Sequence, residues 1–176
     1  LEDRPGAKPL VVRDARIDVR DVTFHYGKGA GVLQNINLTV RGGERVGLVG
    51  HSGAGKTTLV NLILRLYDVE KGTITVDGQD IRDVTQTSLR RAFAVVSQQT
   101  ALLHRSLRDN IMLARDDATD EELLKAARQA EADGFIAKLE DFQGRKSFDA
   151  FVGERGVKLS GGQRQRIAIA RAILKD

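Results

Sequence analysis

The sequence of 176 residues contains no cysteine and no tryptophan, only two prolines and a single methionine. Without cysteine the protein can form neither a disulfide nor a thiolate metal site, which fits a reducing compartment. No apolar run approaches the roughly 20 residues that span a bilayer, and no signal-peptide pattern is present. The first residue is Leu1 rather than methionine, so we expect the chain to be a piece of a longer or processed polypeptide.

Charged residues are abundant but nearly balanced, with 28 basic and 24 acidic side chains and a formal net charge of +4. Proteins that bind nucleic acid present a basic stripe together with stacking aromatic side chains. Here the basic residues alternate with acidic ones, and only two tyrosines and six phenylalanines are present. The composition is that of one ordinary soluble domain, and it does not favour a nucleic-acid partner.

A glycine-rich motif fills every fixed position of the pattern G-x-x-x-x-G-K-[ST]; it reads Gly50-His51-Ser52-Gly53-Ala54-Gly55-Lys56-Thr57-Thr58. Its glycines let backbone N–H groups converge on phosphate oxygens, and a following helix directs its positive end at the same anion. Lys56 would reach the β- and γ-phosphates, and Thr57 would offer a hydroxyl to Mg²⁺. The alternative is a glycine-rich turn with a surface lysine, which the complete motif disfavours.

Hydrophobic periodicity predicts strands on both sides of this loop. The expected strands cover residues 17–26, 36–40, 46–49, 73–76 and 92–96. The first two read as an antiparallel pair, whereas the apolar run at 46–49 reads as a strand buried on both faces. A helix is expected from Thr57 to Leu66, and Asp77-Gly78 marks a tight turn.

The second half of the chain is predominantly helical from Ser106 to Leu139, with a capping box at residues 119–122. A further helix is expected at 160–174, opened by Leu159-Ser160-Gly161-Gly162-Gln163. Ser160 and Gln163 have capping-box spacing, and the two glycines leave backbone amides uncovered, so this helix start could also accept an anion. On spacing alone, a capped helix with small packing residues is the simpler interpretation.

Taken together and in this order, the two motifs resemble the ATP-binding domain of ABC transporters, from about residue 17 to residue 176. The pentapeptide at 159–163 matches the family signature at every position. The resemblance implies an α/β fold: a P-loop NTPase core, an N-terminal antiparallel β subdomain, and an α-helical subdomain carrying the signature. It also implies that two domains pair head to tail. In trans, ATP would then be contacted by Ser160, Gly161, Gly162 and Gln163.

Two single residues and one short segment are also similar to the family pattern. Tyr26 lies where the family places an aromatic side chain that stacks on adenine; the alternative is a core or hairpin aromatic. Gln98 lies where the family has a glutamine near Mg²⁺ and the attacking water, in a loop that senses the membrane domain, although Gln99 leaves the register open. Residues 152–156, with Gly153-Glu154-Arg155-Gly156, resemble an exporter segment that contacts transmembrane coupling helices; the alternative is a solvated charged loop.

The resemblance implies a lead-in from a membrane domain at 1–15 and an ABC ATP-binding domain at 16–176. Its parts would be an antiparallel β part at about 16–45, a P-loop core at about 46–99, a helical subdomain at about 100–160 and a signature helix at 160–175. The implied cofactors are ATP and Mg²⁺. The implied partners are a second ATP-binding domain and transmembrane domains, at the cytoplasmic face of a membrane.

The chain departs from the family pattern after the signature helix. There the family carries an Asp for Mg²⁺, a Glu that polarises the attacking water and a switch histidine, whereas this sequence ends at Asp176 and its three histidines all precede the signature. We therefore expect the 176 residues alone to hydrolyse ATP poorly and to be poorly stable, while the complete protein is an ATP-hydrolysing exporter. The alternatives are a soluble ABC ATPase of the DNA-repair or translation type, or a non-catalytic nucleotide-binding fragment.

Overall fold

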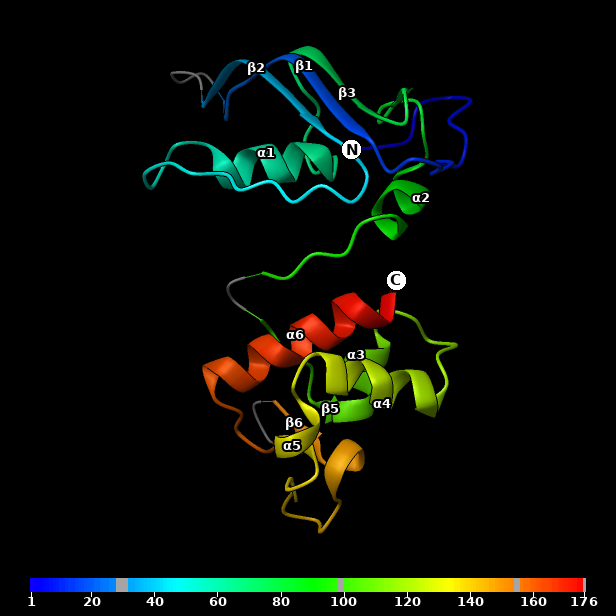
Figure 1. The fold of residues 1–176 in the computed structure, drawn as a ribbon, viewed down its shortest axis with the longest axis vertical. Coiled ribbons are helices and arrows are strands. Elements are labelled where there is room, and N and C mark those ends of the chain that lie inside the picture. Colours follow the sequence, from blue (N-terminus) through cyan, green and yellow to red (C-terminus); the bar gives the residue numbers. More distant parts are fainter. Residues whose placement is uncertain (28–31, 98–99, 154–155, 176) are drawn as a thin grey trace. The chain divides into compact units, whose positions relative to one another are not determined.

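A computed structural model describes residues 1–27, 32–97, 100–153 and 156–175. The chain divides into two compact units, Leu1–Phe93 and Ala94–Asp176. The first is a sheet with helices and the second is mostly helical (Figure 1). In the described ranges, every helix is too short or too polar to cross a membrane.

An antiparallel sheet forms the frame of the first unit. Its strands, in the spatial order β2-β1-β3-β4, are β2 (Leu33–Val40), β1 (Ile17–Phe24), β3 (Lys71–Val76) and β4 (Gln79–Asp80). Central strand β1 places Ile17 opposite Val40 on one side and Val76 on the other. The tight turn predicted at Asp77-Gly78 is confirmed, because both residues have the positive φ angles of a two-residue hairpin turn, 48° and 76°.

Helix α1 (Lys56–Ile63) covers one face of this sheet (Figure 1). Its buried residues Leu59 and Leu62 join a core with Val22 and Ile74 from the strands. Leu89, from the short helix α2 (Gln86–Arg91), completes that core. The burial of these apolar side chains fixes the start of α1, and with it the phosphate-loop motif, against the sheet.

Two strand predictions are wrong. Residues 46–49 and 92–96 belong to no strand in the structure, and Val49 is 97% exposed. A strand buried on both faces needs hydrogen-bonded neighbours and covering layers, and the described sheet of this unit contains only antiparallel strands. The helix predicted to reach Leu66 ends at Ile63, because Arg65 adopts a left-handed backbone conformation with φ of 49°.

Residues 1–15 run along the first unit without forming a helix or a named strand. The carboxylate of Asp77 accepts hydrogen bonds from the backbone N–H groups of Arg13 and Asp14, at 2.7 and 3.1 Å. Closer to the N-terminus, the N–H of Leu10 donates to Ser88 Oγ at 2.8 Å. These contacts attach the segment to the turn after β3 and to α2.

Helices dominate the second unit. Its elements are β5 (Arg105–Ser106), α3 (Leu107–Met112), α4 (Asp120–Gln129), α5 (Asp133–Ile136), a 3-10 turn (Ser147–Asp149), β6 (Phe151–Val152) and α6 (Gly161–Lys175). Buried Leu107, Leu123 and Ile167 come from α3, α4 and α6 and share one core. The predicted capping box is confirmed: the Thr119 N–H donates to Glu122 Oε2 at 2.8 Å, and the Glu122 N–H donates to Thr119 Oγ1 at 3.3 Å.

Candidate functional site

The glycine-rich motif forms an exposed loop that leads directly into α1. Gly55, the N-cap residue of the helix, has a φ of 83°. A Cβ atom built on it would lie 2.6 Å from Leu33 Cδ2 and 3.1 Å from the Val32 carbonyl oxygen. Both the left-handed backbone and the close approach of β2 therefore require glycine here. The sheet holds the loop, and the loop positions the helix start.

Lys56 reaches back across this loop. Its Nζ donates to the carbonyl oxygens of Gly50 and His51, at 2.6 and 2.8 Å. The ammonium group is thereby held over the loop opening by two carbonyl oxygens. An anion that binds in the loop would offer this lysine stronger, charge-assisted hydrogen bonds.

The loop fits a phosphate group. No side chain caps the N-terminus of α1, and its first turn contains no acidic residue, so the positive end of the helix faces outward uncompensated. Residues 51–54 and Thr57 are exposed, whereas Thr58 is only 6% exposed and belongs to the packed side of the helix. The motif thus divides into a packed side and an open side that carries the uncapped start of α1, one ammonium and the Thr57 hydroxyl.

Tyr26, the predicted adenine-stacking residue, lies just beyond the end of β1 and is 46% exposed. Its ring makes edge-to-face contacts with Phe24 and Tyr67, with centroid distances of 4.9 and 5.2 Å. Tyr26 is therefore neither a core residue nor an isolated surface aromatic. It belongs to a three-ring cluster and still presents ring surface to solvent.

The signature motif begins α6 in the second unit. Leu159 is buried in the core, whereas Ser160, Gly161 and Gly162 are exposed. The predicted capping box is present: the Ser160 N–H donates to Gln163 Oε1 at 2.8 Å, and the Gln163 N–H donates to Ser160 Oγ at 3.2 Å. The helix start is therefore fixed by its own side chains, with two glycines on its outer surface.

Packing within the second unit does not explain these glycines. A Cβ atom built on Gly161 or Gly162 would meet no atom within 4 Å. By contrast, a Cβ on Gly156 would lie 2.3 Å from the Phe151 carbonyl oxygen, and Gly153 has a φ of 104°. The glycines at 153 and 156 are thus required by the local backbone, while those of the signature leave open space. The interpretation of the signature as small packing residues loses its support.

Two predicted sites fall partly or wholly outside the described residues. Gln98 and its neighbour Gln99 lie outside them, as do Glu154 and Arg155 of the exporter-like segment. Gly153 and Gly156 are described, on either side of this gap. Val152, the first residue of this segment, is fully buried and pairs with Arg105 through β5 and β6.

Asp141 supports this segment and was not identified from the sequence. Its side chain is buried, and its carboxylate accepts hydrogen bonds from the N–H groups of Gln143, Arg145 and Phe151 at 2.9, 3.1 and 2.9 Å. The Arg145 guanidinium adds an ion pair at 2.6 Å and lies 3.5 Å from the centre of the Phe151 ring. Burial opposes ionisation, but the hydrogen bonds outweigh it and hold the pKa of Asp141 well below its usual range.

We expect Asp141→Asn to lower the thermal unfolding midpoint of the domain by several degrees at pH 7. A carboxylate whose pKa is depressed by folding contributes stability above its unfolded-state pKa, about 3.9, and loses it as pH falls towards the folded-state value. The difference between Asp141→Asn and wild type should therefore be constant at neutral pH and shrink below about pH 4. Glu140→Gln, an exposed neighbour that pairs with Lys146, is the control and should change little. A pH-independent difference would contradict the assigned ionisation.

An exposed phosphate loop that leads into a helix bearing Lys56, together with a second exposed helix start that carries two glycines, is typical of one class of protein, the phosphate-loop nucleotide-binding domains. The family model described as "ABC transporter" matches residues 33–176. The chain therefore belongs to the ABC transporter family, and it is a nucleotide-binding domain of the exporter type.

Relatives support this assignment over the whole chain. The sequence is 58% identical over 176 residues to an uncharacterized ABC transporter ATP-binding protein of Haemophilus influenzae. The aligned region covers 100% of this chain and 29% of that protein. It is 49% identical over 176 residues to an ATP-dependent lipid A-core flippase of Desulfotalea psychrophila. That alignment covers 100% of this chain and 30% of the flippase. The solved structure of a bacterial Atm1-family ABC exporter with ATP bound matches this chain with a TM-score of 0.92 and 44% identity. The match covers 100% of this chain and 30% of the exporter chain. The chain thus spans about 30% of the length of these relatives.

Proposed function

We propose that this chain is the ATP-binding motor domain of a membrane exporter, which couples ATP binding and hydrolysis at a head-to-tail domain dimer to substrate export. The observation that carries the proposal is the pair of exposed helix starts: one with a phosphate loop and Lys56, the other with open glycines at 161 and 162. Two relatives are named as a lipid A-core flippase and an Atm1-family exporter, and these names support export as the direction of transport. The protein would act at the cytoplasmic face of a membrane.

The phosphate loop would hold the triphosphate of ATP. Backbone N–H groups from Ser52 to Thr58 would surround the phosphates, and Lys56 would exchange its carbonyl partners for phosphate oxygens. The exposed Thr57 hydroxyl would take a place among the ligands of Mg²⁺. Bound Mg²⁺ would neutralise phosphate charge. Gln98, in line with the family resemblance, would lie near the metal and the attacking water.

The signature helix would act on the ATP of a second copy. Its uncovered amides and its positive helix end suit the γ-phosphate, which carries the most negative charge. Ser160, Gly161 and Gly162 are exposed, and their surroundings leave room for a partner to approach. Gln163 would fix the helix start through its capping contact with Ser160. ATP would thus join two domains, since the phosphate loop of one copy and the signature helix of the other would contact the same phosphates.

The Gln98 loop and the Gly153–Gly156 segment would connect this chemistry to transmembrane domains. Support comes from β6, which ties the second segment to β5, and from Asp141, which holds the Phe151 N–H. Such a fixed attachment would transmit domain closure to whatever lies against it. We propose ATP hydrolysis for the protein at its natural length.

The adenine contact can be tested by Tyr26→Ala. We expect the affinity for ATP to fall about five- to a hundredfold, because base–aromatic stacking is worth about 1–3 kcal/mol. The affinity would be measured by titration calorimetry on the protein at its natural length, with EDTA present to prevent turnover. Tyr26→Phe, which keeps the aromatic face, is the matched control and should bind ATP nearly as well as wild type. Equal affinities for Tyr26→Ala and wild type would place the adenine elsewhere.

A further inference from the structure

Tyr26 follows a strand end that is held by an acidic side chain from a different part of the first unit. Glu70 precedes β3, and its two carboxylate oxygens both contact His25. Oε1 accepts the His25 backbone N–H at 3.2 Å, and Oε2 lies 2.7 Å from His25 Nδ1. The Glu70 N–H in turn donates to the Thr23 carbonyl oxygen at 3.2 Å. Glu70 therefore fixes both the backbone and the side chain of the residue directly before Tyr26.

The position of this contact matters because the strand pairing stops there. The ladder between β1 and β3 ends with Thr23 opposite Lys71, and Gly27 has a φ of 72°. Tyr26 thus lies between the last paired residue of β1 and a glycine with wide conformational freedom. The His25–Glu70 contact is the anchor at this point. The hydrogen bond with His25 also holds the pKa of Glu70 below its usual range.

The ring of Tyr26 has a second support in Tyr67. This side chain makes the edge-to-face contact at 5.2 Å, and its ring lies 5.7 Å from that of Phe24. Its own loop is held by Arg65, which is 1% exposed and donates to Asp68 Oδ1 at 3.1 Å and to the Val84 carbonyl oxygen at 3.3 Å. Tyr67 therefore lies on a fixed loop between a buried arginine and Glu70.

We propose that Glu70 and Tyr67 are positioning residues for the nucleotide base: they hold Tyr26 in the pose that receives adenine. This inference rests on the proposed contact between Tyr26 and the base. A ring held in place before binding loses less conformational freedom when the base arrives, so affinity rises without any direct contact from Glu70. The effect is specific to the base, because neither residue belongs to the phosphate loop.

The test compares two ligands, ATP and inorganic tripolyphosphate, which carries the phosphates without the base. Affinities would be measured on the protein at its natural length with EDTA present. We expect Glu70→Ala to weaken ATP about two- to tenfold, the effect of losing a hydrogen bond that orients the ring, and to leave tripolyphosphate unchanged. Tyr67→Ala should behave in the same way. Equal losses for both ligands would indicate a general structural defect and overturn the inference.

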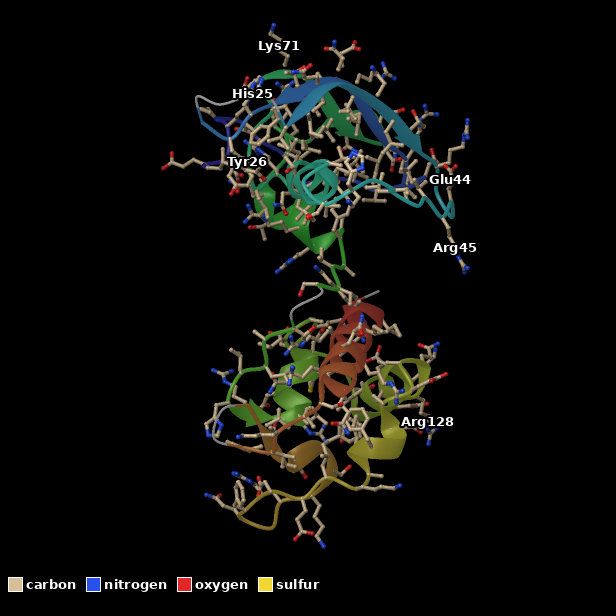
Figure 2. The ribbon with its side chains drawn as sticks, turned by 90° about the vertical axis from the view of Figure 1, so that its left-hand side faces the viewer. His25, Tyr26, Glu44, Arg45, Lys71 and Arg128 are labelled. Atoms are coloured by element: carbon tan, nitrogen blue, oxygen red, sulfur yellow. The ribbon has the colours of Figure 1, made fainter. Side chains whose placement is uncertain are left out.

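Two further measurements make the test decisive. In a Tyr26→Ala background, Glu70→Ala should cause no additional loss of ATP affinity, because Glu70 acts through that ring. The matched control is Glu44→Ala. Glu44 also accepts a backbone N–H, that of Arg41 at 2.8 Å, and lies on the opposite side of the same unit from His25 and Tyr26 (Figure 2). It should bind ATP like wild type.

The possible failures can be told apart. If Tyr26→Ala binds ATP as tightly as wild type, the proposed adenine contact is wrong, and the inference that depends on it falls too. If Tyr26→Ala weakens ATP but Glu70→Ala does not, the adenine contact stands and the positioning role is overturned. A Glu70→Ala loss that persists in full without Tyr26 would also overturn it, since the carboxylate would then act on the nucleotide by another route.

Discussion

Replacing Lys56 with alanine is expected to lower the affinity for ATP by about a hundredfold, the upper range for losing hydrogen bonds to a charged group. In the structure, Lys56 Nζ lies 2.6 and 2.8 Å from two carbonyl oxygens of the loop that it crosses. The same ammonium is placed to exchange these neutral partners for phosphate oxygens. Without it, the loop keeps its backbone N–H groups but loses its only side-chain cation.

The matched variant for Lys56→Ala is Lys8→Ala, which removes an exposed lysine of the same unit and should bind ATP like wild type. Tripolyphosphate serves as the second ligand. Lys56→Ala should weaken it as strongly as ATP, because the lysine contacts phosphates and not the base. Unchanged affinity for either ligand would refute the assignment of the phosphate site.

Replacing Ser160 with aspartate is expected to prevent ATP-dependent closure of two domains, with the closure equilibrium lowered at least about a hundredfold. Aspartate is as good an N-cap as serine, so the helix start should survive. Its negative charge, however, would face the γ-phosphate of the partner's ATP. Binding of ATP to a single domain should be unaffected, since the proposed contact of Ser160 is with the ATP held by the other copy.

Ser160→Asn is the control for Ser160→Asp, because asparagine has nearly the same shape and also caps helices but carries no charge. It should reduce closure far less. Closure can be followed as a change in the distance between two spin labels. The absence of native cysteine from these 176 residues makes single-site labelling within them straightforward. If Ser160→Asp closes on ATP as readily as Ser160→Asn, the contact in trans does not exist.

The features that the sequence predicts well are those fixed by short-range rules. The capping boxes at 119–122 and 160–163 need only the spacing of two side chains, and both are present with the expected hydrogen bonds. The turn at Asp77-Gly78 depends on two backbone angles that those residues tolerate. The two motifs, the phosphate loop and the pentapeptide at 159–163, led to the right family, although the segment before the loop is not a strand here.

The strand predictions failed where structure depends on neighbours. Residues 46–49 have the composition of a doubly covered strand, yet pairing is a property of two segments, and Val49 is 97% exposed. An apolar composition allows a segment to be buried. Whether the segment is buried depends on neighbouring strands that pair with it. The same reasoning applies to residues 92–96, where Val95 is 54% exposed.

The supporting contacts of Glu70 and Asp141 could not be predicted because no short-range rule fixes them. Glu70 meets His25 across 45 positions, and no periodicity links them. Asp141 left a weak signal, since Asp-Phe-Gln-Gly is a typical turn sequence with Asp first and Gly fourth. That signal predicts the turn but not the hydrogen bond to the Phe151 N–H ten residues later.

The central claim, that one ATP is held between the phosphate loop of one copy and the signature helix of another, can be tested by mixing two defects. Lys56→Ala and Ser160→Asp would be co-expressed with different tags at natural length, and the mixed pair would be isolated through both tags. Each variant paired with itself has two defective sites. The mixed pair should have one working site. It should therefore retain half as much bound ATP in its closed form as the wild-type pair. A mixed pair that traps no ATP, or Ser160→Asp paired with itself trapping as much as wild type, would contradict the account.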